Sequence, residues 1–492
     1  MTIESSATAG IPERPAATDP TATGVPGTPE PSGRAHLLRG LCAGAVHLPG
    51  DAGYDEARMP WNVAVDQRPA AVAYPATADE VSDVVRAAAA SGLKVAPQGT
   101  GHNAGPLGPL EDVVLLRTSG MTAVTIDPVR RTARAEAGAL WQDVVEAAAP
   151  YGLAALHGSS PDVGVVGYSL GGGIGWYARQ LGMAANSVVA LDLVLGDGTQ
   201  VRADADTNPE VFWAARGGGG NFGIVTAIEF RLFEIETAYA GMLLWDQEHA
   251  EKVLRTWAAW TETAPDCVST SFRMLNLPPM PELPPFLRGR QLVVVDGAVL
   301  ADDEEAAAVI ADLRALEPEL DTFARVPAAP LSRLHMDPEG PTPGVSASAM
   351  LAELPEAAIE TFLALTGRGS GSTLLSAELR QLGGALARPA EGGGALPMLD
   401  GRFVLFGVAI AMTPELGARG HADATALVDA MTAHASGRDY LNFAEQPVDV
   451  RRSFPEQTWR RLKGIRSAVD PAGLLVANHR IPRLYENGLP TA

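Results

Sequence analysis

Cysteine is scarce in this chain, and the residue groupings that usually bind metal ions are missing. Cys42 and Cys267 are the only cysteines among 492 residues. One optional disulfide is therefore the most that the chain allows, and a disulfide framework is excluded. The sequence contains no CxxC pair and no HExxH, and its nine histidines are scattered without metal-ligand spacing. We therefore expect no metal site.

Basic residues are also few, since 37 Lys and Arg oppose 58 Asp and Glu and give a formal net charge of −21. Nucleic-acid binding requires clustered Lys and Arg that displace counterions, and the sequence has no basic run. No apolar run reaches the roughly 18 residues that a membrane-spanning helix needs. The N-terminus lacks the charged and then apolar pattern of a signal peptide. These absences predict a cytoplasmic protein that binds neither nucleic acid nor membrane.

Apolar material is nevertheless sufficient for large buried cores. Hydrophobic residues make up 46% of the chain and charged residues 19%, and a chain of this length usually forms two domains or more. Residues 1–35 are rich in Pro, Thr, Ala and Gly without a periodic apolar face, so we expect them not to fold. The character of the remaining sequence changes twice, which divides it into residues 36–236, 237–435 and 436–492.

Residues 65–235 alternate between strand and helix patterns. Thr77 and Glu80 fit a capping box, and the apolar residues after them recur at helical spacing until Gly92, a typical C-terminal cap. The strand pattern "LKVAPQ" then leads into a loop of small residues. The Gly-Asp-Gly sequence at 196–198 predicts a hairpin turn between two strands. This region is expected to be α+β, with glycine clusters where its elements join.

The second region, residues 237–435, shows longer strand patterns. We expect strands at "QLVVVDGAVL" (291–300), "TLLSAELRQL" (373–382) and "FVLFGVAIAM" (403–412). Residues 302–316, "DDEEAAAVIADLRAL", predict one helix with an acidic cap. The pattern indicates a second α+β domain built on one broad antiparallel sheet.

Three glycine-rich junctions lie in the first region, at "GTGHNAGPLG" (99–108), "GYSLGGGIGW" (167–176) and "ARGGGGNFGIV" (215–225). Glycine permits positive φ and lets backbone N–H groups approach a pyrophosphate. Each loop alone could be no more than a set of turns, but three together favour a large nucleotide cofactor held by backbone. The chain has neither a Walker A loop nor a GxGxxG followed by an acidic residue about 20 positions later. A scaffold other than the Rossmann fold is therefore expected.

Several stretches resemble one family in the order in which they occur. "QGTGHNAG" (98–105) resembles the flavin-attachment loop of the vanillyl-alcohol-oxidase and p-cresol-methylhydroxylase superfamily. Further stretches are similar to the berberine-bridge-enzyme branch, and together the matches cover residues 40–235 and 436–485. These stretches are "YDEARMPWN" (54–62), "GSSPDVGVVGYSLGGGIGW" (158–176), "ARGGGGNFGIVTAIEF" (215–230), "DYLNFAE" (439–445) and "DPAGLLVANHRIP" (470–482). The resemblance implies an FAD-binding domain of two subdomains, of p-cresol-methylhydroxylase type, plus a substrate-binding domain over 237–435 and a C-terminal return to the FAD-binding domain.

The resemblance also implies FAD as the cofactor and His102 as its covalent attachment site, at the flavin 8α-methyl carbon. A neutral imidazole is a competent nucleophile near neutral pH, and the small residues around it let the ring come close. The other interpretation is a histidine that only hydrogen-bonds within its loop. Bicovalent members carry a cysteine where this chain has Ser160, and a hydroxyl is too weak a nucleophile for the second bond. We therefore expect a single attachment.

The residues expected to bind FAD belong to the three glycine loops and to the C-terminal motif. They are Pro97, Gln98, Gly99, Thr100, Gly101, His102, Asn103, Gly105, Ser160, Pro161, Gly164, Gly167, Tyr168, Gly171, Gly172, Gly173, Gly175, Gly220, Gly223, Ile224, Val225 and Asn442.

A flavin enzyme of the resembled type takes hydride from a substrate C–H bond, while a general base removes a proton from oxygen or nitrogen. Tyr440 fits the Tyr-x-Asn motif in which family members place this base, although a core tyrosine is the competing interpretation. Phe443 stands where a second tyrosine is often found. The resemblance implies a small hydroxyl- or amine-bearing substrate and molecular oxygen as the acceptor. A dehydrogenase with another acceptor and a non-catalytic flavin- or ligand-binding protein stay as alternatives.

Glu378 and Arg380 alternate in "SAELRQLGG" and should point to one face of a sheet over the flavin. They either bind polar groups of the substrate or form a cross-strand ion pair, and the ion pair is favoured. Trp176 and Tyr177 follow the second glycine loop and are expected to serve in packing.

Overall fold

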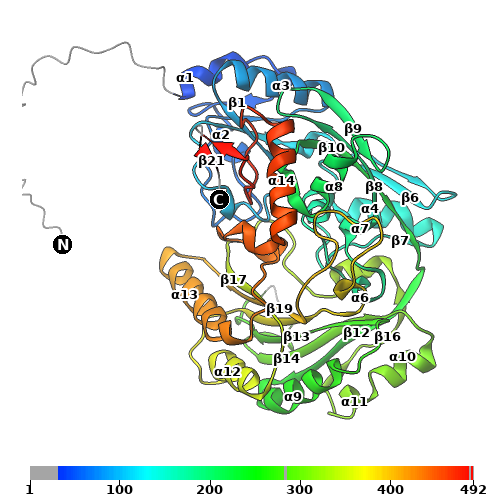
Figure 1. Ribbon diagram of the computed structural model, residues 1–492. Helices are drawn as coiled ribbons and strands as arrows, with labels where there is room; N and C mark the ends of the chain where they lie inside the picture. Colours follow the sequence, from blue (N-terminus) through cyan, green and yellow to red (C-terminus); the bar gives the residue numbers. More distant parts are fainter. Residues whose placement is uncertain (1–30, 282–284, 487–488, 491–492) are drawn as a thin grey trace, which may run out of the picture.

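The computed structural model of the chain describes residues 31–281, 285–486 and 489–490 (Figure 1). Residues 1–30 of the segment expected not to fold lie outside this range. Its last five residues form a short helix, α1 (Pro31–Ala35), so the expectation is wrong for them. The reason is tertiary packing, because Ala35 is buried in the core beneath the first sheet.

The first sheet has four strands in the order β1 (Val46–His47), β2 (Ala71–Ala73), β4 (Val113–Arg117) and β3 (Lys94–Gln98). The last three are parallel and β1 is antiparallel to β2. Strand β3 ends at the first residues of the loop that carries His102. The C-terminal segment extends this sheet, because Leu475 forms a parallel bridge with Val95 of β3.

Helix α3 (Ala78–Ala90) connects β2 to β3, and its ends confirm the predicted caps. The Thr77 hydroxyl accepts a hydrogen bond from the Glu80 amide at 3.2 Å, while the Glu80 carboxylate accepts one from the Ala76 amide at 2.7 Å. Gly92 follows the helix with φ +64°, a conformation that glycine adopts without strain. The buried valines of α3 lie in the core of the first sheet.

The second sheet is antiparallel, and the third glycine loop leads directly into one of its five strands. In spatial order they are β5 (Val124–Asp127), β6 (Thr132–Glu136), β10 (Ile224–Arg231), β8 (Val188–Val194) and β9 (Gln200–Asp204). Strands β8 and β9 confirm the hairpin predicted at 196–198. Helices α4 (Trp141–Ala148) and α8 (Pro209–Gly218) contribute to the same core, where Trp141 and Phe230 meet edge to face.

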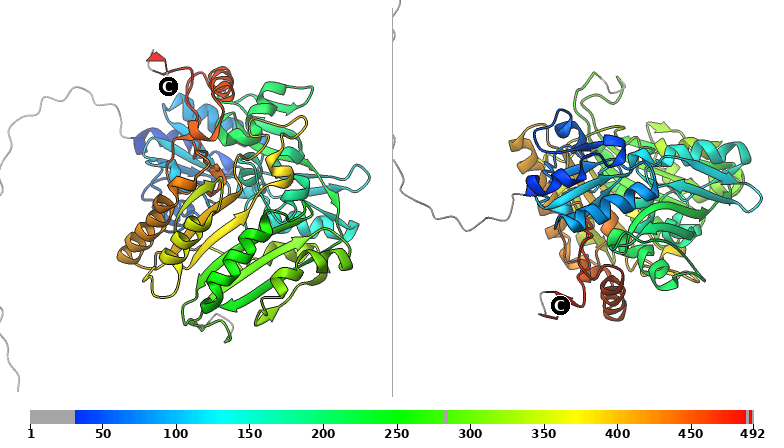
Figure 2. Two further views of the ribbon diagram at one scale, coloured as in Figure 1. Left: turned by 60° about the horizontal axis from the view of Figure 1, so that its bottom comes forward. Right: turned by 90° about the horizontal axis from the view of Figure 1, so that it is seen from above.

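The third sheet is the broad antiparallel sheet that the sequence predicts. Its strands are β12 (Thr237–Asp246), β13 (Val268–Asn276), β14 (Gln291–Val299), β15 (Leu320–Asp321), β16 (Ala324–Pro327), β17 (Gly344–Leu351), β18 (Ser376–Gln381) and β19 (Phe403–Ile410). Their order is β15-β12-β14-β13-β18-β19-β17, with β16 paired to β12. Its core includes Trp257, Phe272, Phe362 and Phe403, and Figure 2 shows the helices outside the sheet.

Helices α9 (Ala250–Thr261), α12 (Glu356–Thr366) and α13 (Pro414–Ala430) contribute to that core. The single helix predicted over 302–316 is wrong. Two helices occur there, α10 (Asp303–Val309) and α11 (Ala311–Arg314). The break falls at Ile310, whose side chain is fully buried in the core while its backbone departs from helical geometry.

The remaining elements are short, apart from α14 (Glu456–Val469) in the C-terminal segment. They include α2 (Tyr54–Ala57), β7 (Leu153–Ala154), α5 (Val165–Leu170), α6 (Ala178–Leu181), α7 (Ala184–Ser187), β11 (Phe233–Glu234), β20 (Tyr485–Glu486) and β21 (Leu489–Pro490). The α+β fold class is confirmed, whereas the domain limits stay a prediction. Across the described residues, every helix is too short or too polar to cross a membrane.

Candidate functional site

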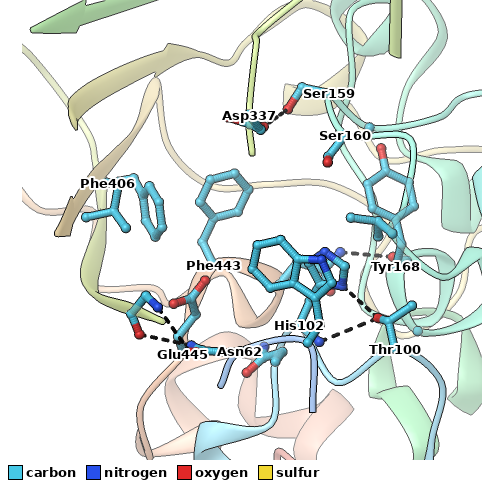
Figure 3. A pocket seen from close by; sticks show the side chains of 18 of the residues that line it. Asn62, Thr100, His102, Ser159, Ser160, Tyr168, Asp337, Phe406, Phe443 and Glu445 are labelled. Atoms are coloured by element: carbon cyan, nitrogen blue, oxygen red, sulfur yellow. Dashed lines mark hydrogen bonds between the residues drawn. The ribbon is translucent and has the colours of Figure 1, made fainter. Parts of the chain in front are cut away.

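A cavity of about 1120 Å³ lies between the glycine loops and one face of the third sheet. Its walls come from all three sheets and from the C-terminal segment, and Figure 3 shows part of them. Small-molecule sites usually measure roughly 300–1,000 Å³. This cavity therefore has room for a large cofactor and a substrate together.

Most of the predicted site residues line this cavity, although they come from four separate parts of the sequence. They are Pro97, Gln98, Gly99, Thr100, Gly101, His102, Asn103, Ser160, Gly164, Gly167, Tyr168, Gly171, Gly220, Gly223, Val225, Tyr440 and Asn442.

The other six predicted residues are placed behind the wall rather than on it. They are Gly105, Pro161, Gly172, Gly173, Gly175 and Ile224. Three of these glycines lie where a side chain would collide: Gly105 against the Glu445 carbonyl, Gly173 against the Tyr168 ring and Gly175 against the His157 carbonyl. Ile224 is fully buried in the core of the first sheet. These positions allow close packing of the loops rather than contact with the cavity.

His102 is fixed in the first loop by contacts to its ring. Gly101 before it adopts φ +86° and packs against Pro60, where a Cβ would come within 2.7 Å. The indole of Trp61 stacks on the imidazole with ring centroids 4.0 Å apart. The Nδ1 atom shares a hydrogen bond of 2.7 Å with the Thr100 hydroxyl. The Nε2 atom is buried and has no hydrogen-bond partner among the described residues.

Asp162 lies beside that unpaired nitrogen, with Oδ1 3.6 Å from His102 Nε2. Its carboxylate accepts hydrogen bonds from Trp61 Nε1 at 2.7 Å, from the Gly340 amide at 2.9 Å and from the Ser160 hydroxyl at 2.9 Å. Burial raises the pKa of Asp162, but His102, the Gly340 amide and the Trp61 indole outweigh it and hold the pKa well below its usual range. The carboxylate is therefore ionised at neutral pH, and the Ser160 hydroxyl is occupied by it.

Tyr440 is buried at the cavity wall, with its side chain only 3% exposed. Its hydroxyl oxygen accepts hydrogen bonds from the Gly173 amide at 2.8 Å and from Asn442 Nδ2 at 3.4 Å. Burial raises the pKa of Tyr440, while these two donors and Arg380 act in the opposite direction. Phe443 stacks on the Tyr440 ring at 5.7 Å. The phenol is thus protonated at neutral pH but has two donors ready to stabilise a phenolate.

The third sheet presents a charged cluster to the cavity. Glu378 and Arg380 do form an ion pair, with Arg380 Nε 2.6 Å from Glu378 Oε1. The pair is not cross-strand as expected, since both residues belong to β18 and side chains two residues apart share one face. Arg273 on β13 pairs with Asp296 on β14 at 2.5 Å.

His335 connects the two pairs of this cluster. Its Nδ1 is 2.9 Å from Asp296 Oδ2 and its Nε2 is 3.5 Å from Glu378 Oε2. Burial and Arg273 lower the pKa of His335, but Asp296, Asp337 and Glu378 together raise it to about 9. The imidazole is therefore charged at neutral pH, and it compensates the two neighbouring carboxylates.

Sequence analysis missed several residues of the site. Trp61 and Asp162 lie inside stretches used for the family resemblance, but nothing local marks them as partners of His102. Arg273 and Asp296 each interrupt an apolar strand pattern, and such an isolated charge could have indicated a buried site. His335 lies in a loop, where the sequence carries no comparable signal.

FAD fits the residues that are present, on two observations. The buried His102 Nε2 lacks a partner among the described residues, as expected for an atom meant to bond to a group outside the chain. Gly167 and Gly219 line the cavity with no atom within 4 Å of where a Cβ would stand. Their backbone is therefore open to a ligand along both loops.

Comparison with known proteins agrees with this geometry. A family model described as an FAD binding domain matches residues 69–204. (R)-6-hydroxynicotine oxidase of Paenarthrobacter nicotinovorans is 34% identical over 203 residues, which are 41% of this chain and 44% of that protein. Xylooligosaccharide oxidase of Thermothelomyces thermophilus is 34% identical over 209 residues, 41% of this chain and 42% of that protein. Residues 69–204 of the chain are therefore similar to an FAD binding domain, and a stretch of about two hundred residues is similar to these two oxidases.

The matched stretches span less than half the length of these two curated relatives. Solved structures cover more of the chain. The Physcomitrella patens protein named BBE-like 1 aligns with a TM-score of 0.80 at 20% identity, over 92% of this chain and 100% of that chain. A chitooligosaccharide oxidase aligns with a TM-score of 0.77 at 21% identity, over 92% and 100%. At such identities the likeness concerns the fold alone, and it confirms the expected fold.

Proposed function

We propose that the chain is an FAD-dependent oxidase that removes hydride from a C–H bond of a small hydroxyl- or amine-bearing substrate, with molecular oxygen as the acceptor. The observation that carries this proposal is His102 in the cavity, whose Nε2 makes no hydrogen bond with any described residue and lies near the glycine loops of a region similar to an FAD binding domain. Related proteins named as oxidases of hydroxynicotine and of xylooligosaccharides support the reaction class. The cytoplasmic location stays a prediction.

The cofactor would be held by the cavity-lining residues of the three glycine loops and covalently by His102. When bound, FAD would supply the oxidising group that accepts the hydride. The chain contributes Trp61 and Thr100, which fix the imidazole plane, and Asp162, whose negative charge faces Nε2. A fixed ring with a carboxylate beside it would assist attack by His102, because the carboxylate stabilises the positive charge that develops on the ring as the new bond forms.

Tyr440 is proposed to take the substrate proton at its side-chain oxygen in the phenolate form, after the phenol has lost its own proton to solvent, so that proton transfer restores the neutral phenol. The Gly173 amide and the Asn442 side chain both donate to that oxygen and stabilise the phenolate. Burial opposes ionisation, so the proton transfer should become faster as pH rises. The apolar surroundings of Tyr440 and Phe443 exclude water from the atoms that exchange the proton.

The test is acid denaturation of the purified chain, followed by gel electrophoresis and inspection for flavin fluorescence. We expect fluorescence to stay with the polypeptide and to be lost in His102→Ala. The matched control His249→Ala removes a half-exposed imidazole outside the cavity and should leave the fluorescence unchanged. Flavin that washes away from the wild-type chain would contradict covalent attachment, and a chain that binds no FAD after supplementation would contradict the proposal as a whole.

The acceptor is tested on the same preparation. Reduced flavin that reoxidises rapidly in air with release of hydrogen peroxide would support oxygen as the acceptor. Slow reoxidation would instead favour a dehydrogenase that passes electrons to another acceptor.

A further inference from the structure

The register of the third sheet shows what the substrate side of the cavity is made of. Across β14, β13, β18 and β19, the residues Val294, Arg273, Glu378 and Phe406 stand side by side, and Leu244 of β12 pairs with Val294. All five line the cavity. This row has a charged centre and apolar residues on both sides.

The next row lies two residues along each strand and faces the same way. It consists of Leu292, Leu275, Ser376 and Val408, which are mutual partners in the register and also line the cavity. Three of the four side chains are aliphatic. Beyond this row the wall continues with Met412, which is 70% exposed and belongs to the cavity lining. The apolar surface therefore runs from the charged centre outward.

The charged centre is already compensated within itself. Arg273 pairs with Asp296, and Arg380 pairs with Glu378. With His335 protonated, three positive groups face three negative groups once Asp337 on the same wall is included. A substrate carrying a full charge would upset this balance in a buried site.

Another acidic side chain of the lining, Glu445, also has a partner within the chain. It accepts a hydrogen bond from the Ser346 hydroxyl at 2.6 Å, and burial raises its pKa. This acidic group therefore already has a hydrogen-bond partner within the chain.

A sugar chain fits such a wall poorly. Each hydroxyl that leaves water must find a hydrogen-bond partner in the protein, and leucine and valine side chains offer none. A molecule with a large apolar body needs only a few polar partners at one end. Arg380 and Glu378 supply those partners, since the guanidinium can donate and the carboxylate can accept.

We propose that the substrate is a neutral, largely apolar alcohol, bound with its hydroxyl at the Glu378–Arg380 pair and its body along Leu275, Leu292 and Val408. This inference rests on the proposed function and narrows its substrate class. It separates this chain from relatives that are named as oligosaccharide oxidases.

The test compares three probes by isothermal titration calorimetry on the flavin-loaded full chain. Biphenyl-4-ylmethanol is apolar with one hydroxyl, cellobiose is a polyol of two rings, and biphenyl-4-ylmethanamine differs from the first probe by a charged amine. We expect the alcohol to bind at least about tenfold more tightly than either of the others. Equal or tighter binding of cellobiose or the amine would overturn the inference, as would no binding of the alcohol.

Variants locate the binding surface. Leu275→Asn should weaken binding of the alcohol about tenfold. Leu37→Asn makes the same change at a side chain that is 69% exposed and is not part of the cavity lining, so it should leave the affinity unchanged. Because Leu275 is buried, Met412→Asn at the exposed rim serves as a second variant that should fold. Unchanged affinity in both would overturn the inference. Calorimetry measures the affinity for each probe and so reports on the class of ligand that binds. Flavin content and hydrogen peroxide release report separately on the proposed function.

Discussion

At the scale of single residues, the two nitrogens of His102 have different environments. Nδ1 is engaged by Thr100 at 2.7 Å, and Nε2 faces Asp162 at 3.6 Å without a hydrogen bond. A carboxylate at this distance stabilises positive charge on the ring, and the effect is large because both groups are partly shielded from water. Asp162 is therefore expected to act through His102 rather than on the substrate.

Replacement of Asp162 by asparagine tests this positioning role. The amide side chain would keep an oxygen that can accept hydrogen bonds from Trp61 and Gly340, but it would lose the negative charge. Asp162→Asn should therefore slow covalent attachment of added FAD by on the order of tenfold. The time course of protein-bound fluorescence measures the rate. Asp162→Glu should restore much of it, and Asp83→Asn on the surface should have no effect. An unchanged rate in Asp162→Asn would show that the charge is not needed.

Tyr440→Phe removes the hydroxyl that we propose as the base. Loss of a general base typically costs a factor of about 10²–10⁴, so anaerobic flavin reduction by a substrate should slow by that amount while flavin attachment is retained. In the wild type this rate should rise with pH, because burial raises the pKa of Tyr440. Stopped-flow absorbance provides the measurement.

The control for this variant is Tyr177→Phe, which also deletes a buried hydroxyl. The Tyr177 hydroxyl has no hydrogen-bond partner among the described residues, and Tyr177 is not part of the cavity lining. It should leave the reduction rate within about twofold of wild type. Equal losses in both variants would mean that Tyr440 serves packing, the competing interpretation of this residue.

At the scale of elements, the third sheet brings together charges that are far apart in the sequence. Arg273 on β13 and Glu378 on β18 are direct register partners. Asp296 on β14 lies two residues along its strand from Val294, the register partner of Arg273. The loop residue His335 then completes the cluster. Each strand on its own would bury an unpaired charge, so the cluster is stable only when the sheet has formed.

The stability of this sheet should depend on the charge of His335. The groups that face the imidazole are Asp296, Asp337, Glu378, Arg273 and Arg380. The pKa is raised from 6.5 to about 9 on folding. A raised pKa means that the folded state binds the proton more tightly, so the stabilisation is complete below pH 6.5 and disappears as pH rises through 9.

We therefore expect Tm to fall as pH rises from 6.5 to about 9. The free energy of unfolding should decrease by up to about 3 kcal/mol over this range. Thermal melts across this range measure the slope. His335→Gln should flatten it, because glutamine cannot titrate. A slope that persists unchanged in this variant would assign the pH dependence to other groups.

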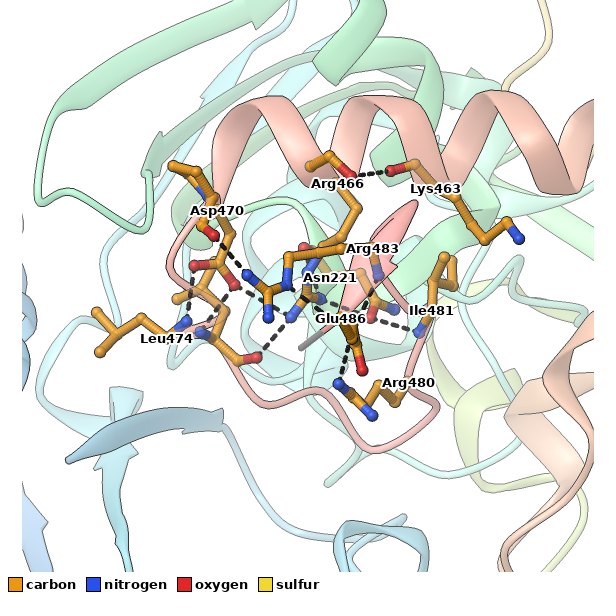
Figure 4. Close-up of polar contacts among 12 residues, drawn as sticks. Asn221, Lys463, Arg466, Asp470, Leu474, Arg480, Ile481, Arg483 and Glu486 are labelled. Carbon is orange, nitrogen blue, oxygen red and sulfur yellow. Dashed lines mark hydrogen bonds and ion pairs between the residues drawn. The ribbon is translucent and has the colours of Figure 1, made fainter. Parts of the chain in front are cut away.

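At the scale of the whole molecule, the C-terminal segment ties the chain back to the third glycine loop. Figure 4 shows Arg466 of α14 between Asn221 and Asp470. The guanidinium donates to the Asn221 carbonyl and side chain at 2.8 Å each and to the Leu475 carbonyl at 2.6 Å, and it pairs with Asp470 at 3.1 Å. Asn221 ends the short helix η6 (Gly219–Asn221), whose glycines line the cavity.

Arg466→Met should therefore destabilise the chain and loosen the cofactor site together. Breaking a buried ion pair by removing one partner costs about 3–5 kcal/mol, so both Tm and the amount of bound FAD should fall. Arg460→Met on the same helix removes an exposed partner of Glu456 and should cost less than about 1 kcal/mol. Thermal melts with flavin absorbance give both readouts. Similar effects of the two variants would argue against this coupling.

The parts that could be predicted from sequence are those decided by short-range patterns. The cap at Thr77, the hairpin at 196–198 and the strand leading to His102 depend on residues within a few positions of each other. The family resemblance of the glycine loops pointed to FAD because the loops occur in a fixed order. The break at Ile310 escaped prediction because burial of one side chain in a distant core decided it.

By itself, the sequence determined the fold class, the resemblance of the glycine loops to flavin-binding loops and the loop in which His102 stands, since periodicity and motif order are local properties of the chain. Only the tertiary structure decided the partners of that histidine, the cluster of Arg273, Asp296, His335 and Glu378, and the apolar wall beside it. These contacts join residues tens of positions apart. Strand register and loop packing bring them together, and neither is encoded in any short stretch of sequence.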